Sequence, residues 1–171
     1  MLRLHIGWTV DRIEKQVTLR TSRDRVWRAL TDYREFGTWF GVCFDKPFAP
    51  GALMTGKIVP TKVDPQVAEA QKPHEGATFT CTVDRIEPQE LFSFRWHPFA
   101  VASGIDYSRE PTTLVVFRVS DVPGGTLLQI SESGFEGIPL NRRAQAFAAN
   151  EQGWAAQTRL IEKYLVQQSS G

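Results

Sequence analysis

The stretch NRRAQAFAANEQGWAAQTRLIEKYLVQ, residues 141–167, decides the fold of this chain. Its apolar residues recur with the period of an α-helix, so that Phe147, Trp154, Ile161 and Leu165 fall on one stripe. We therefore expect one long amphipathic helix of about 26 residues, or about 39 Å. A helix of that length can cross a whole sheet. Asn141 is the expected N-cap.

Two amide side chains, Asn150 and Gln157, interrupt the apolar stripe two turns apart. A buried amide without a partner costs about 1–3 kcal/mol. Each amide therefore either bonds to the backbone or faces a cavity that holds water or a ligand. Gly153 lies between them, where glycine costs about 1 kcal/mol relative to alanine. Close packing of Trp154 against a sheet is the favoured explanation of this glycine, and room for a ligand is the alternative.

The region before this helix has the alternating pattern of β-strands. The expected strands are residues 12–20, 52–59, 77–86, 91–97, 112–119 and 126–133. Two short helices should follow the first strand, because Thr21 with Asp24 and Asp32 with Glu35 have capping-box spacing. Residues 60–76 are polar and rich in proline, and are expected to form a loop or a flap with one helical turn near 67–71. Strands followed by a helix predict an α+β fold, with the helix on one face of an antiparallel sheet.

Composition narrows the class of protein. The 171 residues are 42% hydrophobic, which suits one domain over residues 1–171. The balance of 20 basic to 19 acidic residues argues against nucleic-acid or membrane-surface binding. No apolar run approaches the roughly 20 residues of a membrane span. Residues 1–11 lack the features of a signal peptide, so a cytoplasmic location with reduced Cys43 and Cys81 is expected.

Several packing motifs resemble those of one known superfamily. They include VWRALTD at 26–32, LFSFRW at 91–96, EPTTLVVFRV at 110–119, GGTLLQISESGF at 124–135 and NEQGWAAQTRLIEKYL at 150–165. The chain resembles the SRPBCC (START-like, Bet v 1-like) superfamily, and within it the AHSA1-like family named after the activator of Hsp90 ATPase. The resemblance implies the helix-grip fold, in which a curved antiparallel sheet wraps around the C-terminal helix and leaves an apolar cavity. Members bind lipids, hormones, polyketides or other hydrophobic ligands, and a few are cyclases or hydrolases.

Candidate ligand-binding residues are the aromatic and amide side chains expected to face that cavity. They are Trp39, Phe40, Phe79, Cys81, Phe92, Phe94, Trp96, Phe135, Phe147, Asn150, Trp154 and Gln157. Any single aromatic at strand or helix spacing is more often plain core.

Candidate catalytic residues are few. Glu132 shares a strand face with Leu128 and Ile130, but a solvated carboxylate at a strand end is favoured over an acid or base in a pocket. Asp106 and Tyr107, in the irregular segment 98–111, are the other two candidates, and loop surface is the simpler explanation for both.

The sequence has no motif for a metal site, a nucleophile elbow or a phosphate-binding loop. The histidines, at positions 5, 74 and 97, are not paired in any metal-binding motif, so no metal is expected. The sequence also lacks a GxSxG elbow and a phosphate-binding glycine loop, and no cofactor is expected.

The sequence therefore predicts binding of a small hydrophobic or amphipathic molecule in an internal cavity, oriented by Asn150, Gln157 and Glu132. A cyclase- or hydrolase-type enzyme is one alternative and requires a titratable group inside the cavity. A chaperone regulator or another protein-interaction module is the second, and requires an exposed apolar patch. No chaperone surface is identifiable, so an Hsp90-type partner is not expected. Formation of a homodimer is left open by the sequence.

Overall fold

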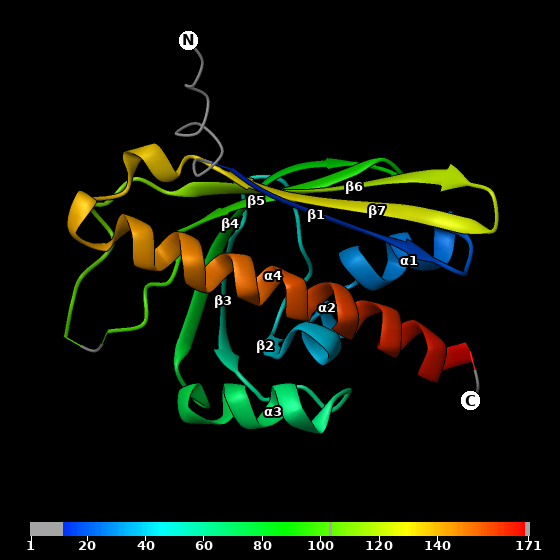
Figure 1. Cartoon of the computed structure of the whole chain (residues 1–171), viewed down its shortest axis with the longest axis horizontal. Coiled ribbons are helices and arrows are strands. Elements are labelled where there is room, and N and C mark those ends of the chain that lie inside the picture. The colour runs from blue at the N-terminus through cyan, green and yellow to red at the C-terminus, as the bar shows by residue number, and fades with distance from the viewer. Residues whose placement is uncertain (1–11, 103, 170–171) are drawn as a thin grey trace, which may run out of the picture.

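The computed structural model describes residues 12–102 and 104–169. His5 and the segment 1–11, on which the signal-peptide argument rested, lie outside the described residues. The fold is the predicted α+β helix-grip arrangement: an antiparallel sheet curls around one long helix, α4 (Leu140–Ser169), with short helices after the first strand (Figure 1).

The sheet has seven strands in the order β1-β7-β6-β5-β4-β3-β2, and every neighbouring pair is antiparallel. The strands are β1 (Arg12–Leu19), β2 (Val42–Phe44), β3 (Leu53–Ile58), β4 (Thr78–Glu87), β5 (Leu91–Trp96), β6 (Thr113–Val122) and β7 (Gly125–Ser133). A register shift between Val83 and Arg85 marks a bulge in β4, a feature that bends a strand and increases its twist. Strand β2 was not predicted, because three residues are too few to show an alternating pattern.

Helices α1 (Arg23–Thr31) and α2 (Tyr33–Phe40) follow β1, as expected. The cap of α2 is confirmed, since the Asp32 carboxylate accepts from the backbone N–H of Arg34 and Glu35 at 2.9 and 3.1 Å. The predicted cap of α1 was wrong by one residue. Ser22, not Thr21, accepts from the N–H of Arg25 at 3.2 Å. The two residue types cap helices almost equally well, so spacing alone does not separate them.

Residues 60–76 contain helix α3 (Pro65–Gln71) and the 3₁₀ turn η2 (Lys72–His74). Hydrogen bonds attach this segment to its neighbours. The Gln71 amide accepts from Thr61 N–H at 2.8 Å and donates to the Phe40 carbonyl, at the end of α2, at 3.0 Å. The Lys163 ammonium on α4 lies 3.2 Å from the Asp64 carboxylate. The helical turn expected near residues 67–71 is confirmed as part of α3, and the segment is a docked helical insertion rather than a loop or flap.

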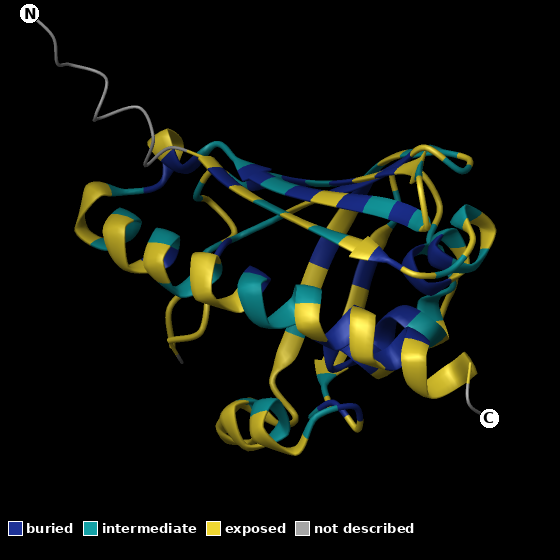
Figure 2. Ribbon diagram, turned by 45° about the vertical axis from the view of Figure 1, so that its right-hand side comes forward, coloured by how far each residue is buried: buried dark blue, intermediate teal, exposed yellow. Residues whose placement is uncertain are grey.

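The core lies between the concave face of the sheet and the helices, where Figure 2 shows the buried residues. Phe92 and Phe94 point inward with Trp96, as the alternation of β5 predicted, and the first two are no more than 1% exposed. The Phe92 ring stacks on the Phe117 ring at 5.9 Å, and both meet Phe36 of α2 edge-on. Aromatic contacts therefore join the middle of the sheet to α2.

Helix α4 is longer at both ends than the expected 141–167. It begins at Leu140, so Asn141 is a residue of the first turn and not the N-cap; the Pro139 carbonyl instead accepts from the N–H of Arg142 and Arg143. The predicted apolar stripe is the buried face of this helix. Its buried residues are Ala146, Trp154, Leu160, Ile161, Tyr164 and Leu165. Within the described part of the chain, no helix combines the length and apolarity that crossing a membrane requires.

Candidate functional site

Glu132 is completely buried, which corrects the favoured interpretation of a solvated strand-end carboxylate. Its position on β7 explains the burial. On either side, Glu132 is paired with Ile13 of β1 and Val115 of β6, and its side chain points toward α4. Leu128 and Ile130, on the same face of β7, are buried too. The alternation of β7 already put Glu132 on the same face as the apolar residues Leu128 and Ile130. Its position near the end of the strand was nevertheless given more weight in the prediction.

Four side chains donate hydrogen bonds to the Glu132 carboxylate. The indole N–H of Trp96 lies 2.7 Å from Oε2 and that of Trp154 lies 2.8 Å from Oε1. Thr113 Oγ1 is 2.5 Å from Oε2, and the Asn150 amide nitrogen is 3.0 and 3.1 Å from the two oxygens. We name these five residues the Glu132 cluster. They come from β5, β6, β7 and α4, so the cluster ties the helix to three strands.

The four donors of the Glu132 cluster take the place of the water molecules that would hydrate an exposed carboxylate. An isolated buried carboxylate is very unfavourable unless it is paired or well hydrogen-bonded. Among the residues that the structure describes, no Lys, Arg or His forms an ion pair with Glu132. The negative charge therefore depends on neutral donors, and charge-assisted hydrogen bonds of this kind are roughly twice as strong as neutral ones.

A cleft of about 60 Å³ lies beside the Glu132 cluster. Its lining residues, from α2, β5 and α4, are Phe40, Trp96, Asn150, Gly153, Trp154 and Gln157. Three of them, Trp96, Asn150 and Trp154, also contact Glu132. The carboxylate therefore lies one side chain behind the wall of the cleft.

Gly153 is exposed and lies where α4 borders the cleft. A Cβ atom added at this position would have nothing within 4 Å. Close packing against the sheet, the favoured explanation of this glycine, was therefore wrong. The missing side chain instead leaves open space next to the Trp154 ring.

The two amides on the apolar stripe are satisfied in different ways. Asn150 donates to Glu132 as described above. The Gln157 Nε2 atom donates to the Phe40 carbonyl at 3.2 Å, whereas its Oε1 atom is buried with no hydrogen-bond partner in the described structure. Both residues line the cleft. Gln157 therefore has one amide atom bonded to the backbone and one buried oxygen without a partner in the described structure.

Aromatic rings form most of the cleft wall. The ring centroids of Trp96 and Trp154 are 5.8 Å apart, and Phe40 lies 6.4 Å from the first and 6.0 Å from the second. Phe79 packs behind this trio, 5.7 Å from Phe40 and 5.5 Å from Trp96. The three rings thus pack against one another along the cleft, and Phe79 supports them from behind.

The remaining candidate ligand residues lie away from the cleft. Trp39 is fully buried and donates its indole N–H to the Ala29 carbonyl at 2.9 Å, so it joins α1 to α2. Phe135 and Phe147 pair with each other at 5.1 Å, near the start of α4. Phe92 and Phe94 belong to the aromatic core described above, and Cys81 is buried on β4. These five aromatic side chains support the cavity walls or the core rather than line the cleft.

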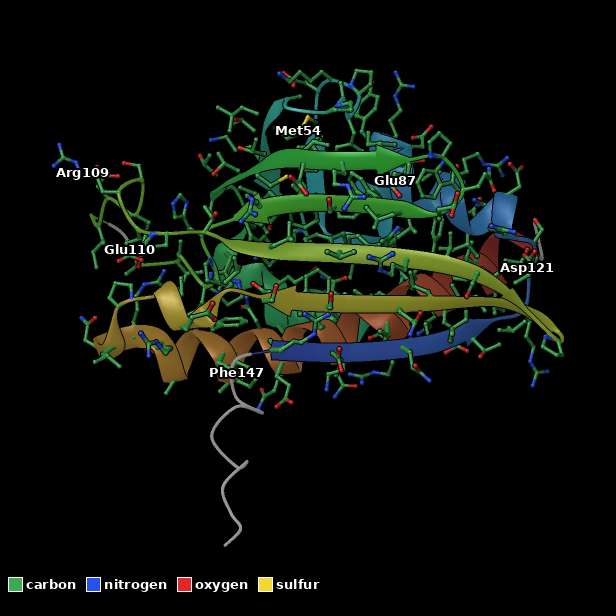
Figure 3. All side chains as sticks on the ribbon, turned by 90° about the horizontal axis from the view of Figure 1, so that it is seen from above. Met54, Glu87, Arg109, Glu110, Asp121 and Phe147 are labelled. Carbon is green, nitrogen blue, oxygen red and sulfur yellow. The ribbon has the colours of Figure 1, made fainter. Side chains whose placement is uncertain are left out.

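Asp106 and Tyr107 lie in the segment that links β5 to β6, and neither lines the cleft. Hydrogen bonds from Ser108 hold the pKa of the Asp106 carboxyl below its usual value. The Arg142 guanidinium of α4 lies over the Tyr107 ring at 4.8 Å and pairs with Glu110 at 2.7 Å. Figure 3 shows Arg109 and Glu110 beyond one end of the sheet and Asp121 at the other. Arg142 therefore anchors this segment beside α4.

No grouping of side chains suited to a metal ion occurs in the ranges 12–102 and 104–169. His74 is exposed on η2. His97 Nε2 lies 3.0 Å from the Glu110 carbonyl, away from His74.

A separate hollow of about 410 Å³ lies over β1, β6 and β7, on the face of the sheet opposite α4. Its lining is mainly charged and amide side chains, which does not suit a hydrophobic ligand.

The two cysteines should react very differently with thiol reagents. Cys43 is exposed, whereas Cys81 is 4% exposed and burial raises the pKa of its thiol to about 12. Because the thiolate is the reactive form, we expect one thiol to react rapidly with Ellman's reagent at pH 8 and the second only on unfolding in urea. A Cys43→Ser variant serves as control, since its folded form should show no rapid phase. Rapid reaction of both thiols in the folded wild type would contradict the buried position of Cys81.

Solved structures from several bacteria share this fold. A protein from Arthrobacter aurescens superposes with a TM-score of 0.69 at 16% identity, covering 93% of this chain and 88% of that chain. Protein MLL2253 from Mesorhizobium loti gives 0.66 at 20% identity, covering 91% and 97%. DynU16, from the dynemicin biosynthetic locus, gives 0.63 at 24% identity, covering 91% of this chain and 47% of that chain. At these identities the similarity establishes the fold alone.

A search of the curated proteins finds no match. The family described as "Activator of Hsp90 ATPase homolog 1-like protein" matches residues 20–166, from the end of β1 nearly to the end of α4. This range includes the cleft and every member of the Glu132 cluster. The chain therefore belongs to the AHSA1 family, whose helix-grip fold is consistent with ligand binding.

Proposed function

We propose that this protein binds a small hydrophobic or amphipathic molecule, and that one end of the molecule enters the cleft between α4 and the sheet. The observation that carries this proposal is the open space beside Gly153, bounded by aromatic rings and by the Asn150 and Gln157 side chains. Ligand sites are mostly apolar with a few placed polar groups, and this cleft has that composition.

The size of the cleft limits how much of a ligand it can hold. Its volume of about 60 Å³ exceeds the roughly 10–15 Å³ that one water requires. Pockets that enclose a whole drug-sized ligand measure about 300–1,000 Å³. The cleft therefore accepts one terminal group, such as a ring or a branched alkyl head. The rest of a larger ligand would lie along the exposed surface of α4 near Gly153.

Binding explains the lining better than acid–base catalysis does. None of the six lining residues has a titratable side chain. Glu132, the nearest carboxyl group, lies behind Trp96 and Trp154, and both of its oxygens already accept hydrogen bonds. A general acid or base must reach the proton that it transfers, and the indoles block that approach. The enzymatic alternative therefore has no observation in its favour.

The protein-interaction alternative requires a continuous apolar surface. The exposed large apolar residues of the described chain are Leu53, Val59, Val101, Ile105, Leu140 and Val166. They are distributed over β3 and its end, the β5–β6 connection and the two ends of α4. This scatter does not favour a chaperone-type interface. Homodimer formation remains a possibility and a cytoplasmic location remains a prediction, both from the sequence alone.

Two substitutions at Gly153 test the proposal. The probe is N-phenyl-1-naphthylamine, an uncharged fluorophore whose phenyl ring suits the cleft. Gly153→Leu should weaken its binding at least tenfold, because the new side chain occupies the open space, whereas Gly153→Ala should bind like the wild type. Both variants should keep or raise the melting temperature, since Gly is about 1 kcal/mol worse than Ala in a helix. Equal probe affinity in all three proteins would overturn the proposal.

A further inference from the structure

We infer that the cleft prefers a positively charged head group, namely an ammonium group bearing alkyl substituents. This inference rests on the proposed function, because it concerns the same cleft and names the class of ligand. Three observations support it: the aromatic walls, the buried Glu132 carboxyl group that has no ion-pair partner in the described residues, and the absence of basic residues from the lining.

The aromatic walls provide the geometry for cation–π contacts. A cation is attracted to the face of an aromatic ring within about 6 Å of its centroid, and tryptophan binds cations best. Trp96, Trp154 and Phe40 are separated by centroid distances of 5.8–6.4 Å. A group that lies in the cleft against these rings can be within that range of more than one centroid. Alkyl substituents on the nitrogen would also bury apolar surface against these rings.

The Glu132 cluster adds a negative charge behind the same walls. Its other members, Trp96, Thr113, Asn150 and Trp154, are uncharged, so the cluster as a whole is anionic when Glu132 is ionised. Both indoles donate their N–H groups to the carboxylate, which leaves their ring faces richer in electrons. Because the Glu132 side chain is fully buried, its charge when ionised acts through a lower effective dielectric than that of bulk water. A cation in the cleft would offset the buried carboxylate.

The basic residues near the lining residues in the sequence do not themselves line the cleft, and Arg159, two residues after Gln157, contacts the Ala155 carbonyl at 3.2 Å. Arg142 pairs with Glu110 at 2.7 Å, and His97 contacts the Glu110 carbonyl. Arg95 is exposed on the outer face of β5. The amide side chains of Asn150 and Gln157 in the lining are uncharged, so they supply no positive charge to pair with a carboxylate. An anionic head group, such as that of a fatty acid, should therefore be disfavoured.

A pair of probes with the same shape isolates the effect of charge. Choline carries a trimethylammonium group, and 3,3-dimethyl-1-butanol replaces its nitrogen with carbon. We expect choline to bind about tenfold more tightly, equivalent to about 1.4 kcal/mol. Binding is followed by NMR through the indole N–H signals of Trp96 and Trp154, which report directly on the cleft wall. Isovalerate, an anion of similar size, should bind more weakly than either probe.

Two variants test the origin of the preference. Glu132→Gln removes the charge and should bring the affinities for choline and dimethylbutanol within about twofold of each other. Trp96→Phe keeps a ring but removes the indole, and should reduce choline affinity severalfold with little change for dimethylbutanol. The second variant keeps the inference testable if Glu132→Gln does not fold.

The outcomes separate this inference from the proposed function. If dimethylbutanol binds as tightly as choline, and Gly153→Leu abolishes both, the cleft binds ligands but does not select cations, and the inference fails alone. If choline binding is tighter but unchanged in both Glu132→Gln and Trp96→Phe, the inference also fails, because the charge is recognised elsewhere. If choline, dimethylbutanol and N-phenyl-1-naphthylamine all leave the indole signals unperturbed, both the inference and the proposed function fail.

Discussion

Replacing Glu132 with leucine should lower the free energy of unfolding by about 3–5 kcal/mol, because several buried hydrogen-bond donors would be left without their common acceptor. Leucine fills similar space but accepts no hydrogen bond. The indole N–H groups of Trp96 and Trp154 and the Thr113 hydroxyl would lose the acceptor that they share. Each buried donor left without a partner costs about 1–3 kcal/mol. The Glu132 cluster also joins α4 to the sheet, so its loss should weaken that attachment.

Urea unfolding of the wild type and three variants measures this effect. Glu132→Gln should lower the free energy of unfolding by an intermediate amount. Its amide keeps one acceptor oxygen but turns an NH₂ group toward other donors. Glu14→Gln is the matched control. Glu14 lies on β1 with its side chain 70% exposed, so its loss should stay within about 0.5 kcal/mol of the wild type. A loss below about 1 kcal/mol in Glu132→Leu would show that the four donors find other partners.

Replacing Gly37 with alanine should lower the free energy of unfolding by about 2–3 kcal/mol, at the upper end of what overpacking costs. Gly37 lies inside α2 and is buried. A Cβ atom there would lie 2.2 Å from the carbonyl oxygen of Val42, which is backbone and cannot swing aside. Helix propensity favours alanine by about 1 kcal/mol, but the clash acts in the opposite direction and is larger. The approach of α2 to β2 therefore requires glycine at this position.

Gly153→Ala is the matched control for this second prediction, because it makes the same change within a helix. It should raise the free energy of unfolding by up to about 1 kcal/mol, since its Cβ atom meets nothing within 4 Å. Thermal and urea unfolding of the two variants should therefore shift in opposite directions from the wild type. A neutral or stabilising Gly37→Ala would contradict the close contact between Gly37 and the Val42 carbonyl.

Local patterns predicted most of the fold. The apolar stripe of α4 and the alternation of β5 and β7 are properties of short windows of sequence, and the structure confirms the arrangement that they indicate. Elements without a usable local pattern were missed or misjudged. Strand β2 has three residues, and α3 has no buried residue and therefore no apolar stripe. The position of α3 depends on bonds to distant residues, such as the one from Gln71 to the Phe40 carbonyl.

The candidate site was predicted only in part. Asn150 and Gln157 drew attention because they interrupt an apolar stripe, and both line the cleft. Glu132 was expected to be solvated, because a lone carboxylate near a strand end is usually exposed and its partners are not visible nearby in sequence. Its donors lie at positions 96, 113, 150 and 154. A donor set of this kind forms only when three strands and a helix come together.

The sequence by itself determined the elements that have a clear hydrophobic period, and the face that each of them buries, because this periodicity reports the average environment of a helix or strand. The tertiary structure alone decided which buried polar groups have partners and where space is left unfilled. Gly37 and Gly153 are both helix glycines in the sequence, yet one meets a carbonyl oxygen and the other meets open space. Glu132 is tolerated in the core for the same kind of reason. Its burial depends on donors from distant segments, and hydrogen bonds act over distances of about 3 Å that only the assembled fold sets.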